Sequence, residues 1–265
     1  MKSFKISHPY HIVNFSPWPF MVSISVLYLI ISFLMILQNK SGRYILFWLA
    51  FTFLNICIYN WIMEIINEGV YRGEHTKKVQ NLLLYGFILF VISEISIFTS
   101  LFFSFFYNSL IPSVELGCDW PPLGISILNP DSIPLYNTML LYVSGITITI
   151  SQNYINKKNK DESLFFLFIT IFLGTLFSIH QYLEYLWANF TISDSIYSTC
   201  FYILTGFHGL HVIIGSILLL VSLIRLIFNQ FIYNNPIGLN TSAIYWHFVD
   251  YVWLVLYGAL YCWGS

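Results

Sequence analysis

Charged residues are scarce in this sequence: Asp, Glu, Lys and Arg together make up 9% of its 265 residues, against about a quarter of an average soluble domain. The 11 basic residues are matched by 12 acidic ones, so we expect no basic surface large enough to bind nucleic acid. Hydrophobic residues, by contrast, make up 57% of the chain. This composition excludes an ordinary soluble domain and predicts a protein that lies in a lipid bilayer.

Cysteine is also scarce, and the four cysteines show neither CxxC nor zinc-finger spacing. Three of the four lie in apolar runs, so we interpret them as small buried hydrophobic residues rather than as a disulfide or a zinc site. The N-terminal stretch is polar and contains proline, without the apolar core and small-residue cleavage site of a signal peptide. We therefore expect the chain to enter its membrane from the compartment in which it is made.

Long hydrophobic runs are abundant. A helix needs about 20 predominantly apolar residues to cross a bilayer. Seven stretches of the sequence meet this requirement, at residues 18–38, 44–63, 81–107, 134–155, 163–187, 196–228 and 242–263. Polar or proline-containing breaks separate them, and the sequence has no internal repeat. The predicted fold class is therefore an all-α membrane protein with seven transmembrane helices.

Positive charge is distributed unevenly between the two sides that such a fold would have. With an odd number of spans, every second connection lies on the side of the N-terminus. That side would hold Lys2, Lys5, Arg72, Lys77, Lys78, Lys157, Lys158, Lys160 and Arg225. The other side would hold only Lys40 and Arg43. Because Lys and Arg concentrate in short loops on the side of synthesis, we expect the N-terminus to face that compartment.

Glu94 lies near the middle of the third apolar stretch, among aliphatic and aromatic residues. An ionisable side chain deep in a membrane is costly, which makes it a candidate for function. One interpretation is a carboxyl group that handles protons. The alternative is a neutral acid that donates one hydrogen bond to a neighbouring helix, and we favour it because one isolated carboxyl group makes no proton path.

The other ionisable groups within the spans are interpreted as structural polar pairs, not as metal ligands. His180 and Glu184 are four residues apart, a spacing that suits a hydrogen bond between imidazole and carboxylate. His208 and His211, in TGFHGLHVIIGS, would need further ligands from other helices to hold a metal or haem. Glycines near this pair favour close helix packing and imidazole-to-carbonyl hydrogen bonds instead. His247 and Asp250 form the third pair.

Several long and unusual strings occur in order over nearly the whole chain. They are HPYHIVNFSPWP at 8–19, YRGEHTKKVQ at 71–80, LLLYGFILFVISE ending at Glu94, ELGCDWPPLGI at 115–125, LNP and IPLYNT within 128–138, FTISDSIY at 190–197, TGFHGLHVIIGS at 205–216 and YWHFVDYVWLVLYGALYCWGS at 245–265. Together these strings resemble the cytochrome c oxidase subunit III family of the haem–copper oxidases.

The resemblance implies a non-catalytic subunit of respiratory complex IV that carries no haem, copper or other metal itself. It implies packing beside the catalytic subunit I, which carries the haems and copper, and contact with other complex IV subunits and with phospholipids. Its implied role is to stabilise subunit I and to support proton uptake while electrons pass from cytochrome c to oxygen. The implied location is the mitochondrial inner membrane, with the N-terminus in the matrix and the C-terminus in the intermembrane space, or alternatively a bacterial plasma membrane.

The resemblance also implies an arrangement of the helices. Residues 1–66 would form a tail and the first two helices, 67–80 a matrix-side linker, and 81–265 a bundle of the last five helices. The two groups of helices would form a V whose cleft holds phospholipids. Glu94 takes the place of the family's buried, carbodiimide-reactive glutamate, and Arg225 that of a basic residue near lipid headgroups.

One departure from the family pattern bears on that lipid. Met63 and Asn67 stand where many relatives carry arginine, so a phosphate partner is missing. Other interpretations stay open at this point: subunit III of a quinol-type oxidase, or a cofactor-bearing membrane enzyme that uses His208 and His211 as ligands. A transporter with Glu94 as its proton-coupled site is disfavoured by the lack of repeats.

Overall fold

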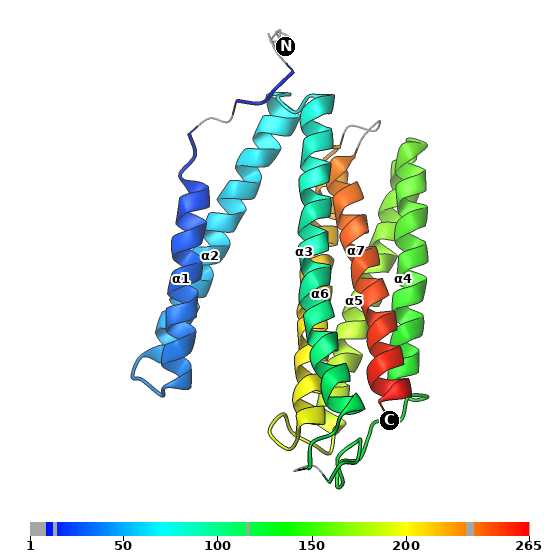
Figure 1. Ribbon diagram of the computed structural model, residues 1–265. Coiled ribbons are helices and arrows are strands. Elements are labelled where there is room, and N and C mark those ends of the chain that lie inside the picture. The colour runs from blue at the N-terminus through cyan, green and yellow to red at the C-terminus, as the bar shows by residue number, and fades with distance from the viewer. Residues whose placement is uncertain (1–8, 13–14, 115–116, 232–235, 265) are drawn as a thin grey trace. The chain divides into compact units, whose positions relative to one another are not determined.

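The computed structural model describes residues 9–12, 15–114, 117–231 and 236–264, and the chain is helical through most of them (Figure 1). Parts of the predicted N-terminal tail, residues 1–8 and 13–14, lie outside the described residues. The helices are α1 (Trp18–Leu37), α2 (Arg43–Ile66), α3 (Lys77–Leu110), α4 (Ile133–Asn156), α5 (Lys160–Trp187), α6 (Ile196–Ile227) and α7 (Ile237–Leu256), with π-helical turns η1 (Asn67–Tyr71) after α2 and η3 (Tyr257–Trp263) after α7. Within this part of the chain, seven helices are long and apolar enough to cross a membrane, which confirms the predicted fold class.

Several helices extend beyond the apolar windows predicted from the sequence. The start of α5 shows why: the Asn159 side chain accepts a hydrogen bond from the Glu162 backbone N–H and caps the helix ahead of its first apolar residue. α6 begins with a capping box between Ser195 and Ser198. Hydropathy detects only the length of helix that lies in lipid, whereas capping side chains decide where the helix begins.

The turn that precedes α6 is held by Asp194, outside the spans. Its carboxylate accepts hydrogen bonds from the Thr191 hydroxyl at 2.7 Å and from the Thr191 backbone N–H at 2.6 Å. These bonds lower the pKa of Asp194, because they stabilise the charged form of the carboxylate. The residues FTISDSIY thus form a tight turn and then cap the start of α6.

The chain divides into two compact units, Met1–Leu83 and Leu84–Ser265. In the first unit, α1 and α2 pack against each other as an antiparallel pair (Figure 1). The buried residues within their interface are small: Ser25 and Ser32 on α1, and Ala50 and Cys57 on α2. In each helix these residues are seven apart and so share a face, which lets the two backbones approach closely in lipid.

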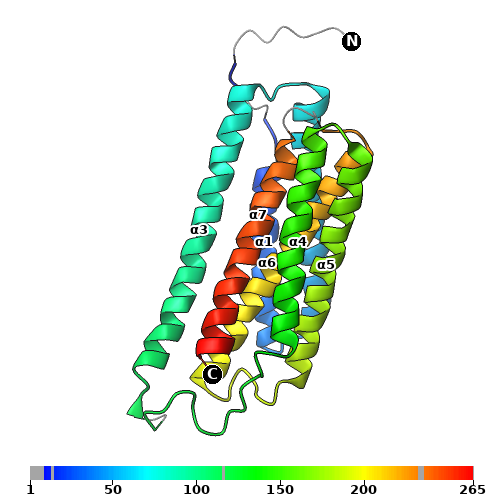
Figure 2. The same cartoon turned by 90° about the vertical axis from the view of Figure 1, so that its right-hand side faces the viewer.

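In the second unit, α4 to α7 form a closed bundle in which α4 packs on α5 and α7, and α6 packs on α5 and α7. α3 stands apart from these four helices (Figure 2) and reaches them through long aromatic side chains rather than through close backbone contact. Phe90 stacks on Tyr245 at 6.4 Å between ring centroids, and Phe98 meets Phe248 edge-on at 6.0 Å. The space between α3 and the bundle is therefore filled by large rings.

Trp246 on α7 occupies the middle of the four-helix bundle and is fully buried. Its Nε1 donates a hydrogen bond of 2.9 Å to the Ser144 hydroxyl on α4. Its ring lies against Gly174 on α5 and Gly215 on α6, where a Cβ atom would come within 2.5 Å and 2.9 Å of ring atoms. One side chain thus contacts all three neighbouring helices, and the glycines provide the space for it.

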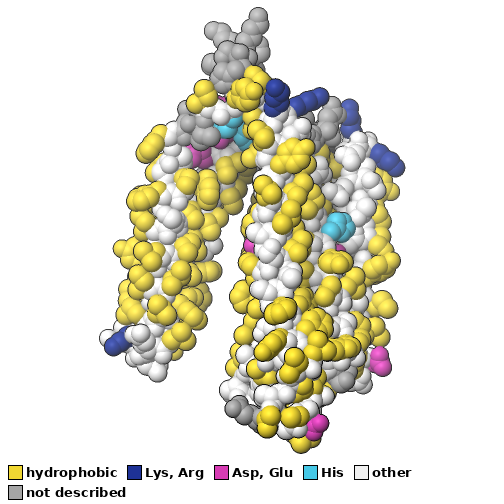
Figure 3. All heavy atoms as spheres, in the orientation of Figure 1, with side chains coloured by type: hydrophobic (Ala, Val, Ile, Leu, Met, Phe, Trp, Pro, Cys, Tyr) yellow, Lys and Arg dark blue, Asp and Glu magenta, His cyan; other side chains and the backbone are white. Residues whose placement is uncertain are grey.

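The outer surface of the helices is apolar. Figure 3 shows hydrophobic side chains along the lengths of the helices, with Lys and Arg side chains near helix ends. Many large apolar residues in every helix are exposed, which would be unfavourable in water and is expected of side chains that face lipid or other membrane subunits.

Candidate functional site

The centre of the candidate site is a polar contact between α3 and α6. His211 Nε2 lies 2.8 Å from Glu94 Oε2, and the two side chains are 10% and 15% exposed. Both residues sit near the midpoints of their helices, so the contact lies far from either end of the spans. The interhelical hydrogen bond proposed for Glu94 therefore exists in the structure, and its partner comes from the histidine motif at 205–216.

The hydrogen bonds of His211 fix how many protons the pair holds. His211 Nδ1 lies 2.7 Å from the backbone carbonyl oxygen of Phe207, which can only accept, so Nδ1 carries a hydrogen. The contact between Nε2 and the carboxyl oxygen then requires one more proton, either on Glu94 or on the imidazole. Glu94 and His211 thus share a single exchangeable proton in the interior of the unit.

Aromatic rings surround this pair. Phe98 meets the His211 ring edge-on at 5.0 Å, Tyr245 stacks on it at 6.2 Å, and Phe248 meets it edge-on at 6.1 Å. Phe98 and Tyr245 are each only 2% exposed. Such apolar surroundings strengthen a satisfied hydrogen bond and make an unsatisfied one expensive.

His208, one turn away on α6, has a different environment. It is fully buried, and neither of its ring nitrogens has a hydrogen-bond partner among the described residues. Its ring packs edge-on against Phe177 at 5.6 Å and lies 5.2 Å from Trp253. The expected imidazole-to-carbonyl bond therefore holds for His211 and is wrong for His208, which contributes aromatic packing.

The expected hydrogen bond between His180 and Glu184 is not formed. His180 Nδ1 donates instead to the Leu176 carbonyl oxygen, 2.8 Å away on its own helix. Glu184 Oε1 accepts a hydrogen bond of 2.7 Å from the hydroxyl of Tyr261, at the end of the chain's last helical segment. Four-residue spacing brings the two side chains close, but each finds a better-directed partner elsewhere.

His247 and Asp250 lie together on α7, with His247 Nδ1 3.9 Å from Asp250 Oδ2. His247 Nε2 also lies 3.3 Å from the Thr149 hydroxyl on α4. These residues line a groove of about 400 Å³ between α4 and α7. Gly145 is part of its wall, and a Cβ there would come within 2.7 Å of Asp250 Oδ2.

Arg225 lies in the last turn of α6, at the end of a candidate membrane span, and is half-buried. Its guanidinium packs over the Phe231 ring at 4.6 Å from the ring centroid. Gly238, at the start of α7, leaves room for the guanidinium: a Cβ there would come within 2.5 Å of Arg225 Nη1. Arg225 is therefore held in place by Phe231 and by the first turn of α7.

Two kinds of contact in the structure were not predicted from the sequence. The first joins residues far apart in sequence, such as Glu184 with Tyr261, for which a single sequence carries no spacing signal. The second is a polar cluster at the end of α2 formed by His11, Glu68 and His75. Its signal was available, because all three residues lie on the N-terminal side of the predicted membrane.

Comparison with known proteins then decides the family. The sequence pattern of the family described as Cytochrome c oxidase subunit III matches residues 8–265. The chain belongs to the cytochrome c oxidase subunit III family. It is 46% identical to Cytochrome c oxidase subunit 3 of Paracentrotus lividus over 258 residues, which cover 97% of this chain and 98% of that protein. The protein of the same name from Papio hamadryas is 45% identical with the same coverage, and that from Trichophyton rubrum is 44% identical with 96% of its length covered.

Membership of the cytochrome c oxidase subunit III family confirms the function inferred from the resemblance. The chain is a subunit of respiratory complex IV, an oxidoreductase complex of the electron-transport chain, and assembles with other subunits of that complex. It is a multi-pass protein of the inner mitochondrial membrane. Neither a quinol-type oxidase nor a cofactor-bearing enzyme built on His208 and His211 is favoured by these relatives.

Proposed function

We propose that within the oxidase this subunit stabilises the catalytic subunit I and supports its proton uptake, without carrying a redox centre itself. The observation that carries the proposal is the pair of Glu94 and His211, which holds one exchangeable proton between α3 and α6. The pair can exchange its proton without losing its hydrogen bond, because the proton can lie on either side chain.

The test is Glu94→Gln in the assembled oxidase. A glutamine amide N–H can donate to the unprotonated His211 Nε2, so the contact between α3 and α6 survives and assembly should be intact. The exchangeable proton is lost, however. We expect slower turnover and a shorter catalytic lifetime, several-fold and most marked at high pH, where protons in the bulk solution are scarce. Oxygen consumption measured against pH, together with subunit stoichiometry, checks this.

Glu184→Gln is the matched control for that variant. Glu184 is also a buried carboxyl group that accepts a single hydrogen bond, from Tyr261, but it has no histidine partner. The Glu184→Gln variant should therefore show the same dependence of activity on pH as the unaltered oxidase. If Glu94→Gln and Glu184→Gln gave the same activity and lifetime as the unaltered oxidase at every pH, Glu94 would have a structural role only.

We propose that the chain carries no redox centre because the histidines within its spans already contact other parts of the protein. His211 bonds to Glu94 and Phe207, His180 bonds to its own helix, and the His208 ring is packed between aromatic side chains. We expect the isolated chain to contain no haem, copper or iron by metal analysis and optical spectroscopy. A stoichiometric haem or copper signal from this chain alone would contradict the proposal.

Orientation and lipid binding complete the proposed role. The basic residues of the connection between α4 and α5 and of the end of α6 support an N-terminus in the matrix and a C-terminus in the intermembrane space. Arg225, fixed at the end of a membrane span, is the candidate for binding a phospholipid headgroup. The lipid-holding cleft implied by the family, with Met63 and Asn67 in place of arginines, stays a prediction.

A further inference from the structure

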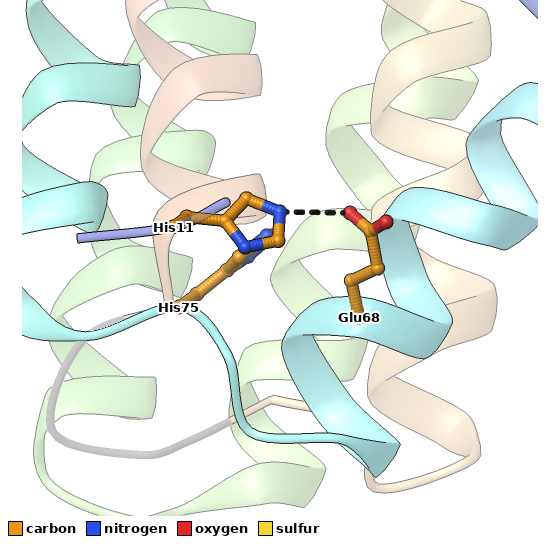
Figure 4. Close-up of side chains that lie close together, drawn as sticks. All are labelled: His11, Glu68 and His75. Atoms are coloured by element: carbon orange, nitrogen blue, oxygen red, sulfur yellow. Dashed lines mark hydrogen bonds and ion pairs between the residues drawn. The ribbon is translucent and has the colours of Figure 1, made fainter. Parts of the chain in front are cut away.

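The end of α2 carries a polar cluster that the proposed role does not use. His11 from the N-terminal stretch, Glu68 from η1 and His75 from the connection before α3 come together there (Figure 4). One ligand atom from each residue can be chosen so that all three atoms lie within 4.8 Å of one another. We propose that His11, Glu68 and His75 form a binding site for a divalent cation of the zinc type.

The donor set and its spacing suit such an ion. Two imidazoles and one carboxylate are ligands of Zn²⁺, at about 2.0–2.2 Å from the metal. Two ligands on a tetrahedral ion are therefore roughly 3.3 Å apart. His11 Nε2 and Glu68 Oε2 are 3.2 Å apart, which already matches that separation. A ring nitrogen of His75 lies within 4.8 Å of the ligand atoms of His11 and Glu68, so His75 has to move closer when the ion binds.

A fourth residue orients the first ligand. His11 Nδ1 lies 3.5 Å from Glu74 Oε2, on the side of the ring opposite Glu68. Metal-binding histidines commonly place a carboxylate on the nitrogen that does not bind the metal, since this fixes the tautomer and the ring direction. This contact is not a hydrogen bond in the structure, and a turn of the His11 ring would direct its Nδ1–H at Glu74 Oε2, leaving the Nε2 lone pair for the ion.

The surrounding chain makes room for the site and holds it in place. A Cβ on Gly69 would come within 2.6 Å of His75 Nδ1, so the absence of a side chain at position 69 allows the His75 ring to lie against η1. The N-terminal stretch is tied down independently. The Thr76 hydroxyl donates to the Pro9 carbonyl oxygen at 2.6 Å, and Ser16 donates to Glu64. The ligands are thus positioned before any ion binds, which lowers the entropic cost of binding.

The sequence predicted no metal ligands in this chain, from the spacing of the cysteines, from the histidines within the spans and from the family resemblance. The proposed site departs from that prediction. Its ion is not a redox centre, and none of its ligands belongs to the pair of Glu94 and His211. The ion would join three segments of the first unit: the N-terminal stretch, the end of α2 and the connection to α3.

The test measures Zn²⁺ binding to the intact, chelator-washed oxidase in mild detergent. Glu68→Gln removes a proposed ligand, and Glu162→Gln, which alters an exposed carboxylate in the first turn of α5, is the control. We expect Glu68→Gln to lose one bound Zn²⁺ per complex relative to Glu162→Gln and the unaltered enzyme. Glu74→Gln should weaken binding by about 10-fold or more, as expected for the loss of an orienting carboxylate. Equal Zn²⁺ stoichiometry and affinity in all four proteins would overturn the proposal.

A second measurement needs no variant and covers the case in which Glu68→Gln fails to assemble. Diethyl pyrocarbonate modifies accessible histidines, and the modified residues can be quantified by mass spectrometry. Zn²⁺ should protect His11 and His75 in the unaltered oxidase, whereas His180, on α5, should be modified equally with and without the ion. Unchanged modification of His11 and His75 in the presence of Zn²⁺ would also overturn the proposal.

Discussion

Replacing Trp246 with alanine is expected to lower the free energy of unfolding of this subunit by about 3–5 kcal/mol, the range for removal of a fully buried large aromatic side chain. The cavity would open where α4, α5, α6 and α7 meet. Ser144 would also lose the hydrogen bond from the indole N–H. Thermal unfolding of the assembled oxidase in detergent, followed by the retention of this subunit, provides the measurement. Trp187→Ala is the control, because Trp187 is 63% exposed and its removal should have little effect.

The importance of this packing can also be tested by adding an atom beside the indole ring at Gly174 instead of removing the ring. Gly174→Ala would place a Cβ atom 2.5 Å from the indole ring, and such overpacking costs about 1–3 kcal/mol. Gly209→Ala, on α6, meets nothing within 4 Å and should be neutral or slightly stabilising, since alanine favours helix over glycine. In a chain that already carries Trp246→Ala, Gly174→Ala should lose most of its penalty, because only Ser216 Oγ, 3.1 Å from that Cβ, would still be close. If the two substitutions were simply additive, the close contact would not limit stability.

The helices could be predicted from the sequence because each depends on local chemistry. Apolar windows located the spans, and the break at residues 38–43 is a tight connection in which Gly42 adopts a positive φ of 73°. Helix ends were less accurate, since capping groups such as Asn159 extend a helix beyond its apolar part. For Glu94 the sequence also indicated a hydrogen bond to a neighbouring helix, and the part-buried carboxyl group does contact His211 on α6.

The partners of those residues could not be predicted. Glu94 bonds to His211, 117 positions away, and Glu184 bonds to Tyr261, 77 positions away. Spacing along one helix predicts which side chains are neighbours, but it does not predict which neighbour a ring turns toward. His180 bonds back to its own helix, so the expected pair with Glu184 does not form. Contacts between helices depend on how the helices pack in three dimensions, which cannot be predicted from the spacing of residues in one sequence.

The two histidines of TGFHGLHVIIGS are expected to respond differently to the same substitution. His211→Leu removes the partner of Glu94 and leaves a part-buried carboxyl group unsatisfied, which should cost about 1–3 kcal/mol of unfolding free energy. His208→Leu loses ring contacts with Phe177 and Trp253, worth about 0.5–1.5 kcal/mol each, but it also relieves the burial of an imidazole without hydrogen bonds. The net change at His208 should therefore be close to zero, as measured by thermal unfolding of the oxidase.

A double substitution separates the hydrogen bond from the space that the ring fills. Replacing both partners of a buried hydrogen bond with apolar residues is often nearly neutral, so Glu94→Leu together with His211→Leu should recover much of the stability lost in His211→Leu alone. Stability would then follow the pairing of the two residues rather than the presence of histidine. If His208→Leu proved more damaging than His211→Leu, the ring contacts of His208 would outweigh the hydrogen bond of His211, and the expected order of the two variants would be wrong.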